Sequence, residues 1–231
     1  MRGWQSRCRI ERRSNPALPL NVRITHAPHA HRQPTQHNPQ PWRTIMARLP
    51  IVTRDMVPAE FQEAFDEMTR DTGGTITGGP YSIAINSPEM ARRRSSLTNY
   101  LRFESTFSKG IQELAILVTA RNFDCPYIWN AHAPAARREG VADALVDAIR
   151  DRQPLPAMAA DEQAIVNYCN EFYANHRISA STFQIALEQF GAQHLVEITA
   201  LMGNYAQTAF FLNAFEVELP ADRTEPVLPV S

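Results

Sequence analysis

Apolar side chains between residues 46 and 220 recur every three or four positions, which is the spacing of one face of an α-helix. Proline, glycine and hydroxyl-bearing residues stand where these segments begin and end. No segment alternates apolar and polar residues as a half-buried strand does. The pattern predicts an all-α fold, a bundle of about seven to eight helices. The expected ranges are 58–72, 87–103, 108–122, 124–139, 142–150, 161–175, 181–190 and 193–212.

The helix boundaries carry specific capping expectations. Ser87, Ser108 and Asp124 precede periodic apolar segments, and each is expected to cap a helix through its side-chain oxygen. Residues 181–184 have the spacing of a capping box, which indicates a further helix start. In the helix from residue 87, the side chains expected to face the core are Met90, Leu97 and Leu101.

The first 45 residues differ from the rest of the chain. They contain eight arginines, six prolines and one acidic residue, and they show no sustained apolar period, so disorder is expected. Three explanations are open: translation begins at Met46, the segment is an organelle transit peptide, or its His26–His31 run binds metal weakly. We expect the helical domain over residues 46–220, followed by a short C-terminal tail, 221–231.

Composition argues against several classes of protein. A formal net charge of -1 gives no general attraction to nucleic acid or to an anionic membrane surface. Three cysteines are too few for a disulfide framework. No run approaches the roughly 18 apolar residues of a membrane span. We expect a cytoplasmic protein, or an organelle protein if the first 45 residues are a transit peptide.

Glu113, Cys125, Trp129 and His132 are the main candidates for chemistry. The last three lie at positions i, i+4 and i+7, so they share one face of a helix. Cys125 falls in the first turn, where the helix dipole lowers the pKa of a thiol. If the preceding helix packs antiparallel, Glu113 reaches His132 and orients its imidazole. The alternative is structural, because a lone cysteine is usually a small core residue and a lone histidine a satisfied one.

The order Glu113, eleven residues, Cys125, two residues, Ile128, three residues, His132 resembles the alkylhydroperoxidase D pattern of Glu, Cys-x-x-Cys and His. That family is one branch of the carboxymuconolactone decarboxylase superfamily. In it, two cysteines form the redox couple while Glu and His relay protons. Ile128 stands in place of the second cysteine, so Cys125 lacks a neighbouring thiol with which to form a disulfide. The resemblance implies an alkylhydroperoxidase D-like helical bundle without that couple.

Other stretches resemble the decarboxylase-type branch of the same superfamily. Residues 127–132 are similar to its tyrosine, any residue, tryptophan, then histidine signature, and 79–81, 100–103 and 212–217 also resemble it. The resemblance spans about residues 56–220. It implies a lyase of aromatic catabolism that removes carbon dioxide from a small carboxylated lactone, without cofactor or metal. It also implies a homo-oligomer, either a dimer, a trimer or a hexamer.

On this interpretation each candidate residue has a role. The departing carboxylate leaves its electron pair in the lactone carbonyl, and the resulting dienolate must be stabilised and protonated. His132 is the expected proton donor, oriented by Glu113. Arg102 or Arg121 would bind substrate carboxylates bidentately. The remaining expected substrate contacts are Tyr81, in a glycine-rich stretch that could form a lid, Tyr127 and Trp129.

Two other functions are open. Cys125 alone could serve a thiol peroxidase or reductase, with an external thiol as the resolving partner. The replacement of the second cysteine of the pattern by Ile128 is also compatible with a non-catalytic helical oligomer. The last helix favours self-association in each case, because it carries more apolar surface than one small bundle hides. The residues concerned are Leu201, Met202, Tyr205, Phe210 and Phe211.

Overall fold

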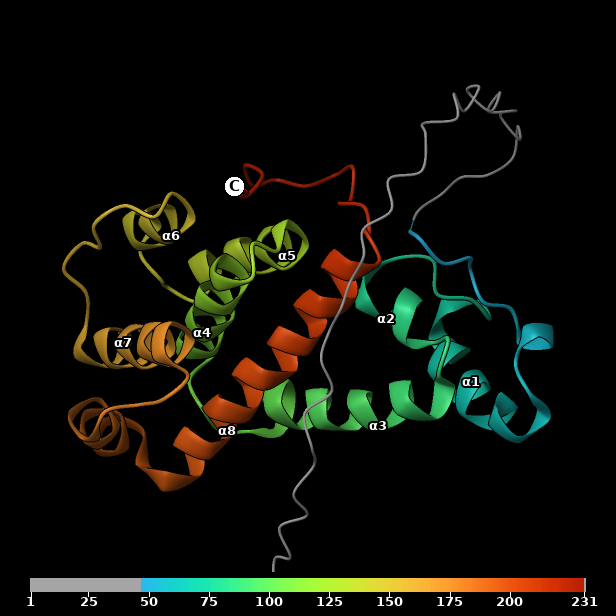
Figure 1. Ribbon diagram of the computed structural model, residues 1–231, viewed down its shortest axis with the longest axis horizontal. Helices are drawn as coiled ribbons and strands as arrows, with labels where there is room; N and C mark the ends of the chain where they lie inside the picture. Colours follow the sequence, from blue (N-terminus) through green and yellow to red (C-terminus); the bar gives the residue numbers. More distant parts are fainter. Residues whose placement is uncertain (1–46, 231) are drawn as a thin grey trace, which may run out of the picture. The chain divides into compact units, whose positions relative to one another are not determined.

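The computed structural model describes residues 47–230, which form eight α-helices and several shorter helical turns (Figure 1). These residues contain no β-strand, so the all-α prediction is confirmed, with the number of helices in the expected range. None of these helices combines the length and the apolar character that crossing a bilayer requires. The extension of residues 1–45, with the explanations offered for it, lies outside the described residues. The α-helices are α1 (Gln62–Thr69), α2 (Gly79–Ala84), α3 (Pro88–Asn99), α4 (Lys109–Asn122), α5 (Pro126–Arg138), α6 (Asp143–Arg150), α7 (Ala160–Asn175) and α8 (Ala180–Ala214).

Helix α4 forms the centre of the bundle, because nearly its whole surface is buried. Every residue from 111 to 121 is buried. α4 packs against α5, α7 and α8, and α7 also packs against α8. Figure 1 shows the long α8, in orange and red, running obliquely across the bundle. Polar side chains on α4 therefore meet partners on α5 and α7 away from bulk water.

Several capping expectations are wrong, although the helices begin near the predicted positions. Ser87 and Ser108 occupy N-cap positions, but neither side chain accepts a capping hydrogen bond. Cys125, and not Asp124, is the N-cap residue of α5, because Asp124 adopts a left-handed backbone conformation with φ 45°. Ser179 caps α8 by accepting a backbone hydrogen bond of 3.3 Å, which moves the N-cap two residues before the expected capping box.

The inward face of α3 also differs from the prediction. Leu97 is 48% exposed, and Arg94 takes an inward position with only 7% of its surface exposed. The inward face of α3 runs through Ala91, Arg94 and Leu101, so Leu97 lies beside that face, and the α-helix then widens into the π-helical turn η4 (Tyr100–Glu104). Leu101 is therefore buried as predicted, Met90 is half-buried, and Leu97 faces outward.

Two helical segments make up α8, and they meet at Gly191. This residue has φ 73° and ψ 167°, a conformation that glycine adopts without strain and that interrupts the helix. The interruption agrees with the predicted separation of helices 181–190 and 193–212. Of the five apolar side chains expected at a subunit interface, Phe210 is largely exposed and the other four are buried or half-buried. Most of that apolar surface therefore belongs to the core of this chain.

The C-terminal tail is anchored to the bundle. Leu228 is buried, and Asn130 of α5 donates a hydrogen bond of 2.9 Å to the backbone carbonyl of Glu225. The Glu225 carboxylate also pairs with Arg137 at 3.1 Å. These contacts fix Glu225 against α5, and Leu228 belongs to the core of the bundle.

Candidate active site

Glu113 and His132 lie side by side in the structure, as their spacing predicted. Glu113 is in the first half of α4 and His132 is near the middle of α5, and the two helices pack against each other. Nδ1 of His132 is 2.7 Å from Oε2 of Glu113. Glu113 is 3% exposed, whereas the His132 side chain keeps 17% of its surface accessible. The carboxylate thus orients the ring from the interior, and the ring can still be reached from outside.

Arg102 is the second partner of the Glu113 carboxylate. Its Nη2 donates to Oε1 at 2.5 Å, so the two carboxylate oxygens bind different side chains. Arg102 belongs to η4, and Nζ of Lys109 donates to its backbone carbonyl. Single π-helical turns of this kind are frequent at functional sites. Nη1 of Arg102 is buried without a hydrogen-bond partner among residues 47–230, which leaves one arm of the guanidinium for a ligand.

The charge state of Glu113 follows from these neighbours. Burial raises the pKa of its carboxyl, but the hydrogen bond and charge of His132, together with the charge of Arg102, outweigh burial and hold the pKa below its usual value. Glu113 is therefore ionised at neutral pH. An ionised carboxylate can only accept hydrogen bonds, so Nδ1 of His132 carries a proton. Nε2 is then the ring nitrogen that remains for proton transfer.

Tyr205 of α8 completes this cluster and was not among the site residues expected from the sequence. Its ring packs edge-on against His132, with ring centroids 5.0 Å apart and planes at 89°. The guanidinium carbon of Arg102 lies 6.0 Å from the centre of the same ring. Burial raises the pKa of Tyr205 to about 12, so its hydroxyl stays protonated and can donate. The apolar pattern of α8 assigned Tyr205 to an interface, and nothing within that helix signals the histidine that it contacts.

The thiol of Cys125 has the opposite character from the one expected. Cys125 is fully buried, and burial raises the pKa of its thiol to about 11, against the smaller opposing effect of the backbone N–H groups of Ile128 and Tyr127. The expectation that the helix dipole would lower this pKa is therefore wrong. Cys169 is also buried and free, and its sulfur contacts that of Met202 at 3.5 Å. Neither cysteine has the partly exposed, electropositive surroundings of a reactive thiol.

Of the three aromatic candidates, one is fully buried and the other two, Tyr81 and Tyr127, are half-buried. Trp129 is fully buried, and its indole Nε1 has no hydrogen-bond partner within residues 47–230. Tyr127 is half-buried, and its hydroxyl lies so near Gly79 that a Cβ there would be 3.3 Å away. Gly79 also has φ 69°, so both its backbone and this close approach favour glycine. Tyr81 lies two residues further on, in α2, and is therefore part of a helix and not of a loop lid.

Arg121 lies apart from this cluster. It is eight positions beyond Glu113 on α4, which is roughly 12 Å along the helix axis. Its guanidinium pairs with Asp124 and donates to the carbonyl oxygens of Arg150 and Pro229 at 3.0 and 2.7 Å. These contacts join the end of α4 to the end of α6 and to the C-terminal tail. They give Arg121 a structural role, and its expected part in substrate binding stays a prediction.

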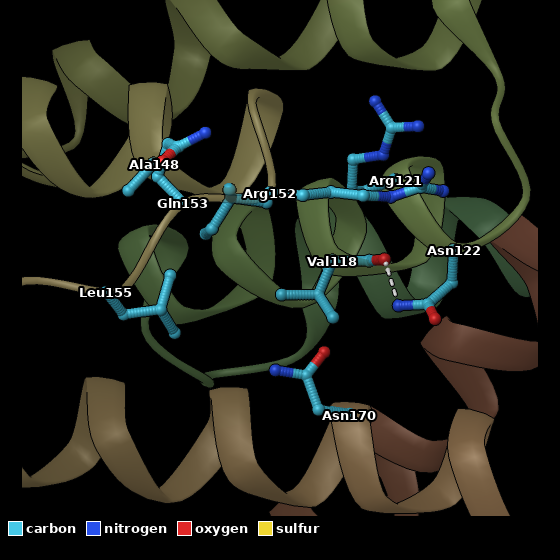
Figure 2. Close-up of a pocket in the computed structure, with 9 residues that line it drawn as sticks. Val118, Arg121, Asn122, Ala148, Arg152, Gln153, Leu155 and Asn170 are labelled. Carbon is cyan, nitrogen blue, oxygen red and sulfur yellow. Dashed lines mark hydrogen bonds between the residues drawn. The ribbon is translucent and has the colours of Figure 1, made fainter. Parts of the chain in front are cut away.

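Arg121 also lines a cavity of about 260 Å³ (Figure 2). A second arginine there, Arg152, donates to Asp124 at 2.9 Å, so one carboxylate pairs with both guanidinium groups. The positive charge of this cavity is therefore partly neutralised. The lining residues are Val118, Arg121, Asn122, Ala148, Ile149, Arg152, Gln153, Leu155 and Asn170.

The cluster around Glu113 does not have the composition of a metal site. Its third charged member is Arg102, a cation that occupies the carboxylate oxygen which a metal ion would need. Within residues 47–230, no three His, Cys, Asp or Glu side chains are grouped as metal ligands. The residues present suit proton transfer and anion binding.

Several solved structures of low sequence identity share the fold of this chain. An uncharacterised peroxidase-related protein of Silicibacter sp. has a TM-score of 0.59 and 17% identity, over 77% of this chain and 93% of that one. An alkylhydroperoxidase core protein of Ralstonia eutropha, also peroxidase-related, has a TM-score of 0.57 and 15% identity, over 77% and 94%. The apo form of a debrominase has a TM-score of 0.55 and 16% identity, over 78% and 94%.

The chain therefore has the alkylhydroperoxidase D-like helical fold, as the sequence resemblance implied. At these identities the likeness is one of fold, and it does not distinguish the decarboxylase-type branch. No protein-family model matches the chain. A search of curated proteins also gives no match.

Proposed function

We propose that this protein is a cofactor-independent lyase that removes carbon dioxide from a small carboxylated lactone or a related aromatic-catabolite acid. The observation that carries the proposal is the buried Glu113 carboxylate, bound by His132 at 2.7 Å and by Arg102 at 2.5 Å. This arrangement fixes one tautomer of the His132 imidazole beside the guanidinium of Arg102 and the phenol of Tyr205. Proteins with this fold include enzymes, since one of them is named as a debrominase.

The proposed reaction begins at the bond between the substrate carboxylate and the adjacent ring carbon. When that bond breaks, carbon dioxide leaves and the electron pair moves through the conjugated alkene into the lactone carbonyl, which gives a dienolate. Nη1 of Arg102 and the hydroxyl of Tyr205 supply hydrogen bonds to the developing oxyanion. Nε2 of protonated His132 then transfers a proton to a carbon atom of the dienolate, and solvent returns a proton to the imidazole. The electrons balance without an oxidant or a reductant.

Glu113 acts in this scheme through its neighbours and not on the substrate. Its carboxylate accepts a hydrogen bond from Nδ1 of His132, and this bond keeps Nε2 directed away from the interior. Glu113 is thus a positioning residue, and His132 is the catalytic acid.

A thiol peroxidase or reductase is the weaker proposal. Cys125 is fully buried, and burial raises the pKa of its thiol to about 11, so little thiolate forms at neutral pH. A non-catalytic oligomer accounts less well for the buried Glu113 carboxylate, which binds both His132 and Arg102. It also gives no reason for Nη1 of Arg102 to be buried without a hydrogen-bond partner among residues 47–230. The homo-oligomeric state and the cytoplasmic location stay predictions.

Replacing His132 with glutamine tests the proposal. The substrate is 4-carboxymuconolactone, and carbon dioxide release is measured with the full-length protein. Loss of a general acid should lower the turnover number by about 10²–10⁴-fold. His194→Gln is a matched control, because His194 bonds Thr106 at 3.0 Å and has no contact with Glu113. Equal turnover in the wild type and His132→Gln, or none in the wild type, would contradict the proposal.

A further inference from the structure

Arg94 of α3 is buried without a carboxylate partner. It is 7% exposed, and its Nε donates to Oε1 of Gln207 at 3.2 Å while Nη2 donates to the hydroxyl of Thr208. Both partners are uncharged. The other arginine with less than a tenth of its surface exposed is Arg121, and it pairs with Asp124. Among residues 47–230, Arg94 is thus the buried arginine whose charge has no counterion.

One arm of the Arg94 guanidinium also lacks any hydrogen bond. Its Nη1 is buried and has no partner within residues 47–230. The guanidinium carbon lies 5.0 Å from the ring centre of Tyr81 and 5.8 Å from that of Phe211. These aromatic faces attract a cation, but they do not replace the hydrogen bonds of the unpaired N–H groups. A buried charge with free donors is expected where an anion binds.

Arg94 lies beside the cluster around Glu113. Tyr205, Thr208 and Phe211 follow one face of α8 at intervals of three residues, each interval being roughly 4.5 Å along the axis. Tyr205 contacts His132 and Arg102, and the next two residues contact Arg94. The positive charges of Arg102 and Arg94 both lower the pKa of Tyr205 against the effect of burial. The Tyr205 side chain is therefore flanked by both guanidinium groups.

We propose that Nη1 of Arg94 binds a carboxylate of the substrate that is retained in the product. This inference rests on the proposed function, and it specifies the substrate as a dicarboxylic acid. The carboxylate that leaves must lose its charge to become carbon dioxide, so an ion pair to that group would oppose the reaction. The retained carboxylate keeps its charge throughout, and Arg94 binds it equally before and after the reaction. Arg94 thus sets specificity and affinity.

A carboxylate fits this position better than a phosphate. Nη1 offers two N–H groups, and the rest of the guanidinium is already bound to Gln207 and Thr208. A phosphate has three terminal oxygens that require donors, whereas Phe211 supplies none and Tyr81 has a single hydroxyl. A planar group with one negative charge matches the donors that are present.

Acetate is the probe that tests this assignment, because it is small enough to reach Nη1 whatever the shape of the natural substrate. Full-length protein labelled with nitrogen-15 arginine is titrated with acetate, with neutral acetamide and with inorganic phosphate. The Arg94 side-chain signal is assigned by its loss in Arg94→Lys. We expect a saturable shift of this signal with acetate and none with acetamide. No shift with acetate, an equal shift with acetamide, or a stronger response to phosphate would overturn the proposal.

Variants separate ligand binding from a purely structural role. In the wild type, the thermal unfolding midpoint should be higher in acetate than in sodium chloride of equal ionic strength. Arg94→Gln should abolish this difference. Arg93→Gln is the matched control, because Arg93 is an exposed neighbour that pairs with Glu89. It should keep the acetate response. Arg94→Lys retains the charge and should recover part of the response, and an equal increment in all variants would contradict the assignment.

The two proposals fail separately in these experiments. With 4-carboxymuconolactone as substrate, Arg94→Gln should raise KM at least tenfold and change kcat by less than threefold, since uniform binding is lost. An unchanged KM would overturn the role of Arg94. If His132→Gln turns over normally while acetate still shifts the Arg94 signal, the lyase proposal fails and the carboxylate site stands.

Discussion

Replacing Glu113 with glutamine tests whether one buried carboxylate holds the candidate site together. Glutamine has almost the same shape, but its amide accepts at one end and donates at the other. One of the two present donors, His132 or Arg102, would then face an N–H group. Hydrogen bonds to charged groups contribute about 1.5–3 kcal/mol each, and breaking a buried pair costs about 3–5 kcal/mol. Because glutamine is easier to bury than a carboxylate, we expect the free energy of unfolding to fall by about 2–4 kcal/mol.

The measurement is urea unfolding of the full-length protein at neutral pH, followed by far-ultraviolet circular dichroism. Glu89→Gln is the matched control, because Glu89 also pairs with two arginines, Arg92 and Arg93, but on the surface. Solvent screens these surface pairs, so the control should lose much less stability. If Glu113→Gln loses no more than Glu89→Gln, the network around Glu113 does not form as described.

Three further predictions concern pH, the buried thiol and Arg121. The pKa of Glu113 is lowered in the folded protein, so its ionisation stabilises the fold above the unfolded pKa of about 4.3, and this contribution is lost as pH falls through the folded value. The difference in unfolding free energy between wild type and Glu113→Gln should therefore narrow in acid, and a constant difference would refute this linkage. The pKa of the Cys125 thiol is raised to about 11, so Cys125 should react with a thiol reagent in mild alkali only after the protein unfolds. Mass spectrometry of labelled peptides measures this reaction. Rapid labelling of Cys125 in the native protein would support the thiol peroxidase proposal instead. Arg121→Gln should lose about 1–3 kcal/mol of stability through its contacts with Asp124 and the tail, yet leave KM for 4-carboxymuconolactone within a factor of two. A large rise in KM without loss of stability would return Arg121 to the substrate site.

The helices could be predicted because their signal is local. Apolar spacing along α4 and α7 follows from which residues those helices bury, and Gly191 marks its own break through a backbone conformation that favours glycine. The Glu113–His132 pair was also predictable, because two consecutive helices joined by a short connection lie antiparallel. Their spacing then brings the two positions opposite each other.

The rest of the site depends on tertiary contacts that no local pattern carries. Tyr205 and Arg94 lie more than a hundred residues apart in the chain, and each resembles an ordinary surface or interface residue in its own helix. The inward face of α3 carries the buried Arg94, which apolar spacing does not signal, so Leu97 was assigned to the core in error. The pKa of Cys125 depends on burial by the whole bundle, and this effect outweighs the helix N-terminus.

The tautomer of His132 tests the central claim most directly, and the test needs no substrate. Nitrogen-15 NMR of the histidine-labelled protein, with the His132 signals assigned by His132→Gln, distinguishes a protonated ring nitrogen from a bare one. In the uncharged ring, Nδ1 should carry the proton and Nε2 should be bare, because Glu113 accepts from Nδ1 at 2.7 Å. Glu113→Gln should abolish this preference. A ring that carries its proton on Nε2 in the wild type would show that the carboxylate does not orient the proposed catalytic acid.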